Sequence, residues 1–211
     1  HPRNFDNSIY HGKLVGTQVQ NSFGEVKGVL GKTPPPPESL TKIFQGNTNN
    51  VAWCNAIEIG ANGHPVIAYS VQKDSAEMKV GTGGEDHRYR YAWFDGETWH
   101  DYEVGYAGTR LYAREDDYTG LICIDPANPS TVYFSSNVIP WNGKPLISKA
   151  DNKQHYELWR CDTTNGGENW HITKVTSDSS TDNIRPMMPE GSDEPILIWM
   201  EGEYTTYQNF N

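Results

Sequence analysis

The chain has 211 residues, of which 36% are hydrophobic and 12% aromatic, and it contains 20 glycines and 13 prolines. This length suffices for a buried core, and the mixture of Gly, Pro and aromatic residues favours many short β-strands over helices. The net charge of −10 argues against nucleic acid as a partner, because binding to phosphates depends on Lys and Arg. No apolar run approaches the roughly 20 residues needed to cross a bilayer, so we expect no membrane-spanning helix and no membrane partner.

The chain contains three cysteines, which cannot all pair with one another. Cys54 and Cys123 lie in apolar, strand-like runs, so we expect small buried side chains rather than a disulfide. The sequence contains no CxxC or HxxxH spacing that would indicate a metal site. Binding of a metal ion by Cys together with His stays open as an alternative.

The N-terminal segment has the least regular pattern. Residues 7–10 and 13–19 predict the two strands of a hairpin that turns at His11 and Gly12. Four consecutive prolines at 34–37 predict a polyproline II rim or spacer, and residues 39–44 predict a short outer strand.

A more regular group of four strands follows. Asn62-Gly63 is a strong two-residue turn signal, a long polar loop follows the second strand, and Asp95-Gly96 turns the chain again. The expected strands span residues 51–59, 65–71, 89–94 and 98–104.

The same order recurs in the next part of the chain. Residues 115–137 show it most clearly: three acidic residues and a tyrosine precede a short apolar strand, a turn with two prolines, and a β-branched return strand. The strands expected in this group span residues 121–124, 131–135, 156–160 and 170–175. A fourth group begins with strands at 183–188 and 195–200.

Two Gly-Trp turns make the repetition explicit. Residues 95–99 (DGETW) and 165–170 (NGGENW) occupy the same place in successive groups, and each resembles a degenerate Asp-box, the turn between the third and fourth strands of a sialidase-like propeller blade. Repeats of four antiparallel strands predict a β-propeller, whereas a sandwich would not give this repeated order.

We therefore predict an all-β fold with one propeller domain over residues 1–211, built from about four four-stranded antiparallel blades. Their approximate limits are residues 1–49, 50–105, 106–177 and 178–211. A closed ring takes about 4–8 blades and the last group is short, so we expect the C-terminal half of a larger propeller.

A propeller places two kinds of loop on one face, around the central channel, where ligands usually bind. The candidates expected there are Arg3, Asn7, Asn55, His87, Arg88, Arg114, Tyr118, Trp141, Tyr156 and Arg185. Simpler alternatives remain for several: Arg3 as a solvated residue, His87 as an exposed loop residue, Tyr118 as channel packing, and Arg185 as an ion-pair partner of Asp182 or of residues 115–117. Trp141 is harder to explain without a ligand, because an exposed Trp is unusual and sugar rings stack on it.

Three segments resemble a known family. They are residues 116–137 (DDYTGLICIDPANPSTVYFSSN), 155–170 (HYELWRCDTTNGGENW) and 182–191 with 195–210 (DNIRPMMPEG and PILIWMEGEYTTYQNF). These look like BNR-repeat polysaccharide lyases of the seven-bladed propeller type, which include ulvan lyases and lyases that cleave rhamnose–glucuronate linkages. The similarity covers most of the chain after about residue 50.

The resemblance implies a secreted or periplasmic lyase whose partner is an acidic polysaccharide and which requires no cofactor, with structural Ca²⁺ or Zn²⁺ left open. It also implies that the N-terminal half of the propeller is missing from this chain. In the family, a base removes the C5 proton of a uronic acid, an Arg neutralises the carboxylate, and an acid, often Tyr, protonates the departing oxygen.

Carried onto this sequence, the resemblance makes Arg3 or Arg185 the neutralising group, Tyr118 the acid or part of the acid/base pair, and His87 a candidate base. The family's base is commonly a His from an earlier blade. The substrate-binding residues would be Arg88, Arg114, Trp141, Tyr156, Asn7 and Asn55. Two alternatives stay open: a sialidase-like glycoside hydrolase, which needs paired carboxylates and usually an arginine triad, and a carbohydrate-binding propeller without catalysis.

Overall fold

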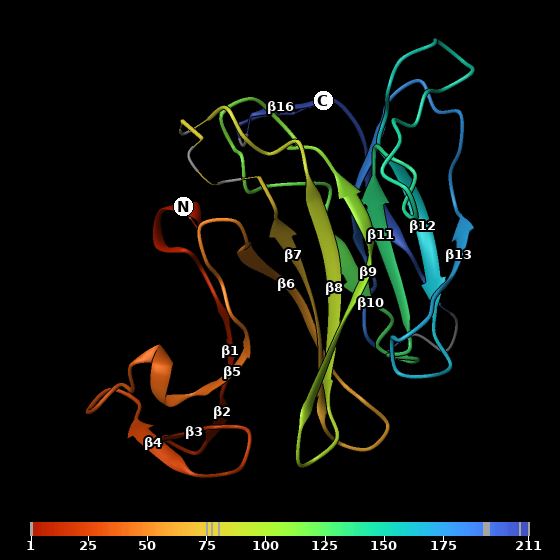
Figure 1. The fold of residues 1–211 in the computed structure, drawn as a ribbon. Helices are drawn as coiled ribbons and strands as arrows, with labels where there is room; N and C mark the ends of the chain where they lie inside the picture. The colour runs from red at the N-terminus through yellow and green to blue at the C-terminus, as the bar shows by residue number, and fades with distance from the viewer. Residues whose placement is uncertain are drawn as a thin grey trace.

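The computed structural model describes residues 2–74, 76, 78, 79, 81–191, 195–206 and 208–210, with the side chains of Arg3 and Phe210 left out. The fold is all-β, as predicted, and its helical content is limited to the short 3-10 helices Pro2–Phe5 and Pro37–Ser39 in the described part of the chain (Figure 1). Among the same residues, no helix has the length and apolar character that a membrane crossing requires.

Two four-stranded antiparallel sheets form the centre of the molecule, each with its strands in chain order. The first contains β6 (Val51–Ile59), β7 (Pro65–Gln72), β8 (His87–Phe94) and β9 (Trp99–Gly108). The second contains β10 (Ile122–Ile124), β11 (Thr131–Ser136), β12 (Glu157–Asp162) and β13 (His171–Lys174). The eight strands expected from the sequence in these two groups are therefore present, with ends that differ by a few residues.

Both faces of the first sheet are covered at β7, which explains the nearly continuous apolar run of this strand. Successive side chains of a strand point to opposite faces. Val66 and Ala68 belong to a core cluster shared with the second sheet, whereas Ile67, Tyr69 and Val71 belong to a cluster shared with β1 and β5. A strand covered on both sides needs apolar residues at odd and even positions alike.

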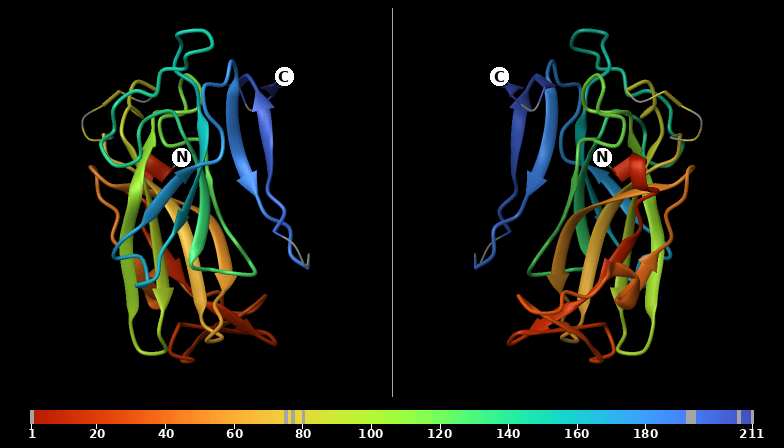
Figure 2. Two further views of the ribbon diagram at one scale, coloured as in Figure 1. Left: turned by 90° about the vertical axis from the view of Figure 1, so that its right-hand side faces the viewer. Right: turned by 90° about the vertical axis from the view of Figure 1, so that its left-hand side faces the viewer.

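Smaller sheets surround this centre. They comprise the pair β1 (Ile9–His11) and β5 (Thr41–Phe44), the sheet of β2 (Lys13–Val15), β3 (Gln18–Gln20) and β4 (Val26–Val29), the pair β14 (Asp182–Met187) and β15 (Ile198–Gly202), and the pair β16 (Tyr204–Thr206) and β17 (Asn209–Phe210). Figure 2 shows β14 and β15 as a separate layer at the side of the molecule.

The predicted hairpin at His11-Gly12 is wrong. β1 pairs with β5, far along the chain, and β2 pairs instead with β3. The turn lies between Val15 and Gln18, where Gly16 adopts a φ of 59° that other residues rarely reach. The cysteine expectation holds in part: Cys123 on β10 is buried and free, whereas Cys54 on β6 is free and exposed.

Three strands from different sheets meet along one line. β10 packs beside both β6 and β14, and a cavity is lined by all three. The loops 73–86, 109–121 and 137–156 gather at the end of the molecule that is uppermost in Figure 1, which we call the upper end. The turns 60–64, 125–130 and 163–170 lie at the opposite, lower end.

Candidate functional site

Arg185 and Tyr118 are in direct contact at the upper end, although 66 residues separate them along the chain. Arg185 Nε donates a hydrogen bond to the Tyr118 hydroxyl oxygen at 3.0 Å, and a terminal guanidinium nitrogen donates to the same oxygen. The backbone N–H of Arg185 donates to the Gly120 carbonyl at 2.9 Å, which fixes β14 against the loop that carries Tyr118. The structure thus brings two predicted catalytic residues together.

Aromatic rings enclose this pair. The Arg185 guanidinium lies 5.0 Å from the centre of the Tyr204 ring and 5.7 Å from that of Tyr118, within the range of cation–π attraction. Tyr112 contacts both Tyr118 and Tyr204, with ring centres 6.0 and 5.5 Å apart, and Trp53 lies 5.4 Å from Tyr118. Trp53 and Tyr112 were not predicted, because a Trp in a strand and a Tyr in a loop carry no signal of their own.

The pairing determines how Tyr118 can act. Burial raises the pKa of the Tyr118 phenol, and the hydrogen bond and charge of Arg185 offset part of that rise. A guanidinium only donates hydrogen bonds, so the Tyr118 oxygen accepts and its own hydrogen is left for another acceptor. Tyr118 is therefore a neutral phenol at neutral pH, with a proton to give.

The backbone around this contact is strained. Arg185 has a φ of 56°, and Leu121 and Arg114 have φ values of 76° and 78°. The register of β14 with β15 shifts between Ile184 and Met187, so Arg185 lies in a β-bulge. Bulges redirect side chains, and strained residues of this kind cluster at functional sites.

A cavity of 320 Å³ lies beside Arg185, between β6, β10 and β14. Asn55 lines the same cavity from a second irregular position, the register shift in β6 between Cys54 and Ala56. The Asn55 Oδ1 atom is buried and has no hydrogen-bond partner in the described structure. Asn55 and Arg185, both predicted, therefore line a single cavity.

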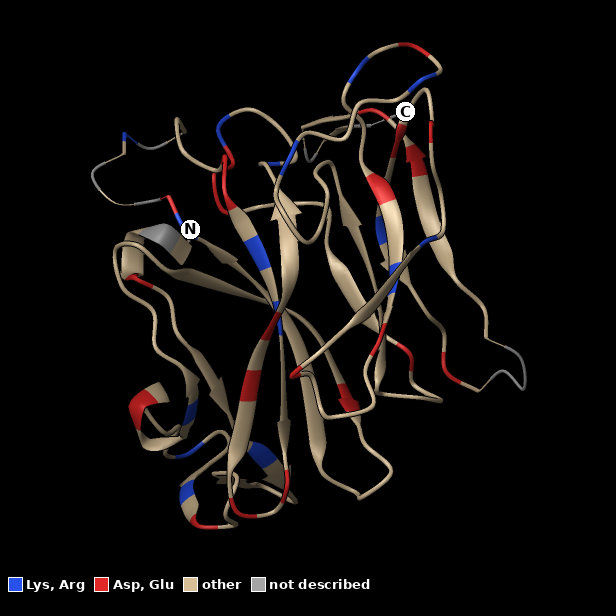
Figure 3. Ribbon diagram, turned by 45° about the vertical axis from the view of Figure 1, so that its right-hand side comes forward, with Lys and Arg blue, Asp and Glu red and all other residues tan. Residues whose placement is uncertain are grey.

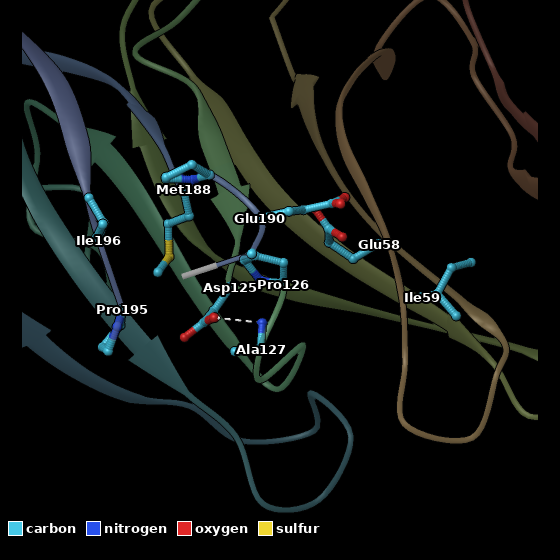
Figure 4. Close-up of a pocket in the computed structure, with 11 residues that line it drawn as sticks. Glu58, Ile59, Asp125, Pro126, Ala127, Met188, Glu190, Pro195 and Ile196 are labelled. Atoms are coloured by element: carbon cyan, nitrogen blue, oxygen red, sulfur yellow. Dashed lines mark hydrogen bonds between the residues drawn. The ribbon is translucent and has the colours of Figure 1, made fainter. Parts of the chain in front are cut away.

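An acidic cavity of 430 Å³ continues from this one toward the lower end, and Glu58 and Met188 line both (Figure 4). Burial raises the pKa of Glu58, and the nearby carboxylates of Glu190 and Asp125 raise it further. The charge along β6, β10 and β14 thus changes from positive at Arg185 to negative at Glu58. An anionic ligand would be favoured at the Arg185 end and repelled from the other.

His87 does not face this site. It begins β8, its side chain is fully buried, and its two ring nitrogens have no hydrogen-bond partner in the described structure. Burial lowers the pKa of the imidazole, and nearby acidic groups such as Asp74 offset only part of that effect. The Asp74 carboxylate accepts hydrogen bonds from the backbone of Gly84 and Glu85 and so holds the loop in place. This placement contradicts the expected role of His87 as a base, because a substrate does not reach a fully covered ring.

Two other predicted side chains are already committed to the protein. Tyr156 is buried, and its hydroxyl donates to the Thr109 carbonyl at 2.5 Å, so its ring is unavailable for sugar stacking. Arg88 forms ion pairs with Asp86 at 2.7 Å and Glu103 at 3.1 Å. These contacts make Tyr156 and Arg88 structural residues of the upper end.

Lys and Arg are scattered among acidic residues over the whole molecule (Figure 3).

The remaining candidates differ in their surroundings. Trp141 is 63% exposed in the loop between β11 and β12, where a ring could stack on it. Arg114 is exposed, whereas the Asn7 side chain donates to the Ala52 carbonyl at 2.7 Å and joins the N-terminal segment to β6. The Arg3 side chain lies outside the described part of the structure.

The alternative of an ion pair between Arg185 and Asp182 is not realised. Asp182 instead lies 3.5 Å from His155, whose other ring nitrogen is 2.8 Å from Asp151. Among the residues that the structure describes, no group of three or more His, Cys, Asp or Glu side chains is placed to hold a metal ion. Comparison with protein-family models, with curated proteins and with solved structures finds no match to this chain.

Proposed function

We propose that this chain is a polysaccharide lyase, secreted or periplasmic, that cleaves a rhamnose–glucuronate-type polysaccharide by β-elimination. One observation carries the proposal: the direct contact of Arg185 with Tyr118 at the edge of a cavity, inside a set of aromatic rings. A fixed cation and a neutral proton donor are two of the three groups that elimination at a uronate needs, and the third is a base.

The chemistry assigns a task to each of the two side chains. A base takes the C5 proton, and none of the described residues assigned to this site supplies it. The negative charge that then develops on the uronate carboxylate is held by the Arg185 guanidinium through its paired donors. The electron pair forms the C4–C5 double bond as the C4–O bond breaks. Tyr118 gives its proton to the departing oxygen, and Arg185 stabilises the phenolate that remains.

The proposal includes a propeller arrangement of the sheets. In support, the first strands of three successive sheets, β6, β10 and β14, lie side by side, and core clusters join each sheet to the next. Large apolar side chains are exposed at both sides of this array, at Ile57 and Ile59 on β6 and at Met187 and Ile198 on β14 and β15. In our proposal, further sheets of the ring cover them.

A carbohydrate-binding propeller without catalysis is the second candidate. The burial of His87 favours it, because the expected base is then absent from the site. A sialidase-like hydrolase is less well supported, since Arg88, Arg90 and Arg110 all bond carboxylates and form no free arginine triad with Arg185.

Product chemistry distinguishes the three candidates. The protein is incubated with a panel of uronate polysaccharides, and near-ultraviolet absorbance of the 4,5-unsaturated uronate is followed beside new reducing ends. Absorbance supports the lyase, reducing ends without absorbance indicate a hydrolase, and binding without either product indicates a binding module.

Loss of the proton donor tests the site assignment. We expect Tyr118→Phe to slow elimination by about 10²- to 10⁴-fold, the usual contribution of a general acid. Tyr102→Phe, which removes a hydroxyl that contacts Glu168 on the surface, serves as the control and retains activity. Full activity of Tyr118→Phe would contradict the assignment even if the protein proved to be a lyase.

A further inference from the structure

A separate cleft opens at the lower end, away from Arg185 and Tyr118. It has a volume of 570 Å³ and lies between the turns 60–62, 127–130 and 164–166, where the two four-stranded sheets approach each other. Its wall includes Tyr91, Trp93 and Phe94 from β8. The volume is within the range of small-molecule sites, about 300–1,000 Å³.

The lining of this cleft carries no charged residue. This is unusual in a chain with a net charge of −10, and the acidic cavity next to it shares Ala127 but contains Glu58 and Asp125. A neutral lining offers no counter-charge to an anion or a cation. It favours an uncharged ligand.

Trp93 forms a rigid aromatic wall. Its ring stacks on His100, with centres 4.4 Å apart and planes 22° from parallel, and its Nε1 donates to the Gly166 carbonyl at 2.7 Å. Gly166 has a φ of 71°, and a Cβ there would lie 2.9 Å from the indole. The glycine therefore permits the turn to close against the ring, which holds Trp93 in one position before any ligand arrives.

Uncommitted polar groups surround the aromatic wall. The side-chain oxygens of Asn62 and Asn165 accept backbone hydrogen bonds within their own turns, so their NH₂ groups are left as donors. Ser130 and Thr164 add hydroxyl groups to the lining. Hydroxyls, amides and an aromatic face in an uncharged cleft are the combination that binds sugars, whose rings have apolar faces and polar edges.

We propose that this lower-end cleft binds one or two pyranose units of a neutral saccharide, as a second site independent of the elimination site. The ring would lie along the Trp93 wall, and its hydroxyls would meet the amides and hydroxyls of the three turns. The proposal does not rest on the lyase assignment, because a protein without catalysis would have the same cleft.

The test follows the indole resonances of the full chain by ¹⁵N-edited NMR, assigned through Trp→Phe variants. The probes are cellobiose, maltose and free glucuronic acid at millimolar concentration. We expect the Trp93 indole signal to shift saturably with at least one neutral disaccharide and not with glucuronic acid. Absence of any shift, or a shift confined to Trp141 at the upper end, overturns the proposal.

Variants locate the sugar. Thr164 and Ser130 are exposed turn residues, so Thr164→Val and Ser130→Ala remove a hydroxyl without disturbing the core. Each variant should weaken binding by up to about tenfold, the value of one hydrogen bond. Trp93→Phe should weaken it by roughly tenfold through the smaller ring. Trp199→Phe, on β15 and outside the lining of the cleft, should leave the affinity unchanged. Unchanged affinity in both turn variants would overturn the proposal whatever the stability of Trp93→Phe.

Discussion

The first four-stranded sheet, β6–β9, and the two-stranded sheet, β14–β15, differ in how far their apolar side chains are buried. The first is covered on both faces at its second strand, β7, where Ile67 is 3% exposed. The second leaves Met187, Ile198 and Trp199 exposed by 62%, 53% and 38%. The residue with the clearest chemical role, Arg185, lies on the less covered sheet. The scaffold is thus built where packing is complete, and the cation is held where it is not.

β14 is nevertheless held firmly along its inner side. Its backbone at Asn183 donates to the Tyr156 carbonyl at 2.9 Å, and its Asn183 carbonyl accepts from the Ser135 hydroxyl at 2.5 Å. A further bond joins the Arg185 N–H to Gly120. These bonds to the second sheet and its leading loop position Arg185 without any cover on the outer side of β15.

Matched truncations in the two sheets should show the largest contrast. Ile67→Ala removes a fully packed side chain and should lower the free energy of unfolding by about 2–5 kcal/mol. Ile198→Ala removes a half-exposed one and should change it by less than about 0.5 kcal/mol. Urea denaturation of both variants measures the difference.

The same pair tests whether β15 is covered in the 211-residue chain on its own. If Ile198→Ala costs as much as Ile67→Ala, then another copy of the chain covers β15 in solution, and the contrast between the sheets disappears. The small effect that we expect is compatible with the proposed ring, whose further sheets are not among the described strands.

Acid should weaken the covered sheet through His87. Because burial lowers the folded-state pKa of this imidazole below its ordinary value of about 6.5, the unfolded chain binds the proton first. Stability is therefore full above about pH 6.5 and falls as the pH drops toward the lower folded pKa, by at most about 1.4 kcal/mol per pH unit for one proton. The negative charges of Asp74 and Asp117 favour the protonated imidazole and so reduce the effect.

The variant His87→Gln provides the comparison, since its amide does not titrate. We expect the dependence of unfolding free energy on pH to become shallower between about pH 6.5 and 5. Some slope should persist, because burial also lowers the pKa of His11. Identical slopes for the two proteins would show that His87 is accessible to protons in the folded state.

The same contrast explains what the sequence could and could not predict. The strands of β6–β9 follow from apolar runs and from the turns at Asn62-Gly63 and Asp95-Gly96, which are local signals. The meeting of Tyr118 with Arg185 follows from the repeated strand order, which places both at the same end.

The predictions that failed are those that depend on contacts between residues far apart in the sequence. Nothing within residues 7–19 shows that β1 pairs with β5, because the partner lies beyond a long excursion. The polar loop before His87 suggests exposure, yet the His87 side chain is fully buried. Asp116 accepts a hydrogen bond from the Gly81 N–H at 2.7 Å, and Asp74 accepts from the Gly84 and Glu85 amides, so these bonds hold the loop in place. Such contacts are set by tertiary structure and leave no periodic trace in the sequence.

The smallest expected effect concerns the strain at Arg185. Both Arg185→Ala and Arg185→Gly remove the guanidinium and should abolish the proposed elimination equally. They should differ in stability, because only glycine adopts a φ of 56° without a steric cost, so the Gly variant should be more stable by about 1 kcal/mol. Urea denaturation of the two variants measures this difference. Equal stability would mean that the bulge relaxes once the side chain is gone, and hence that the contact of Arg185 with Tyr118 itself maintains the strained backbone.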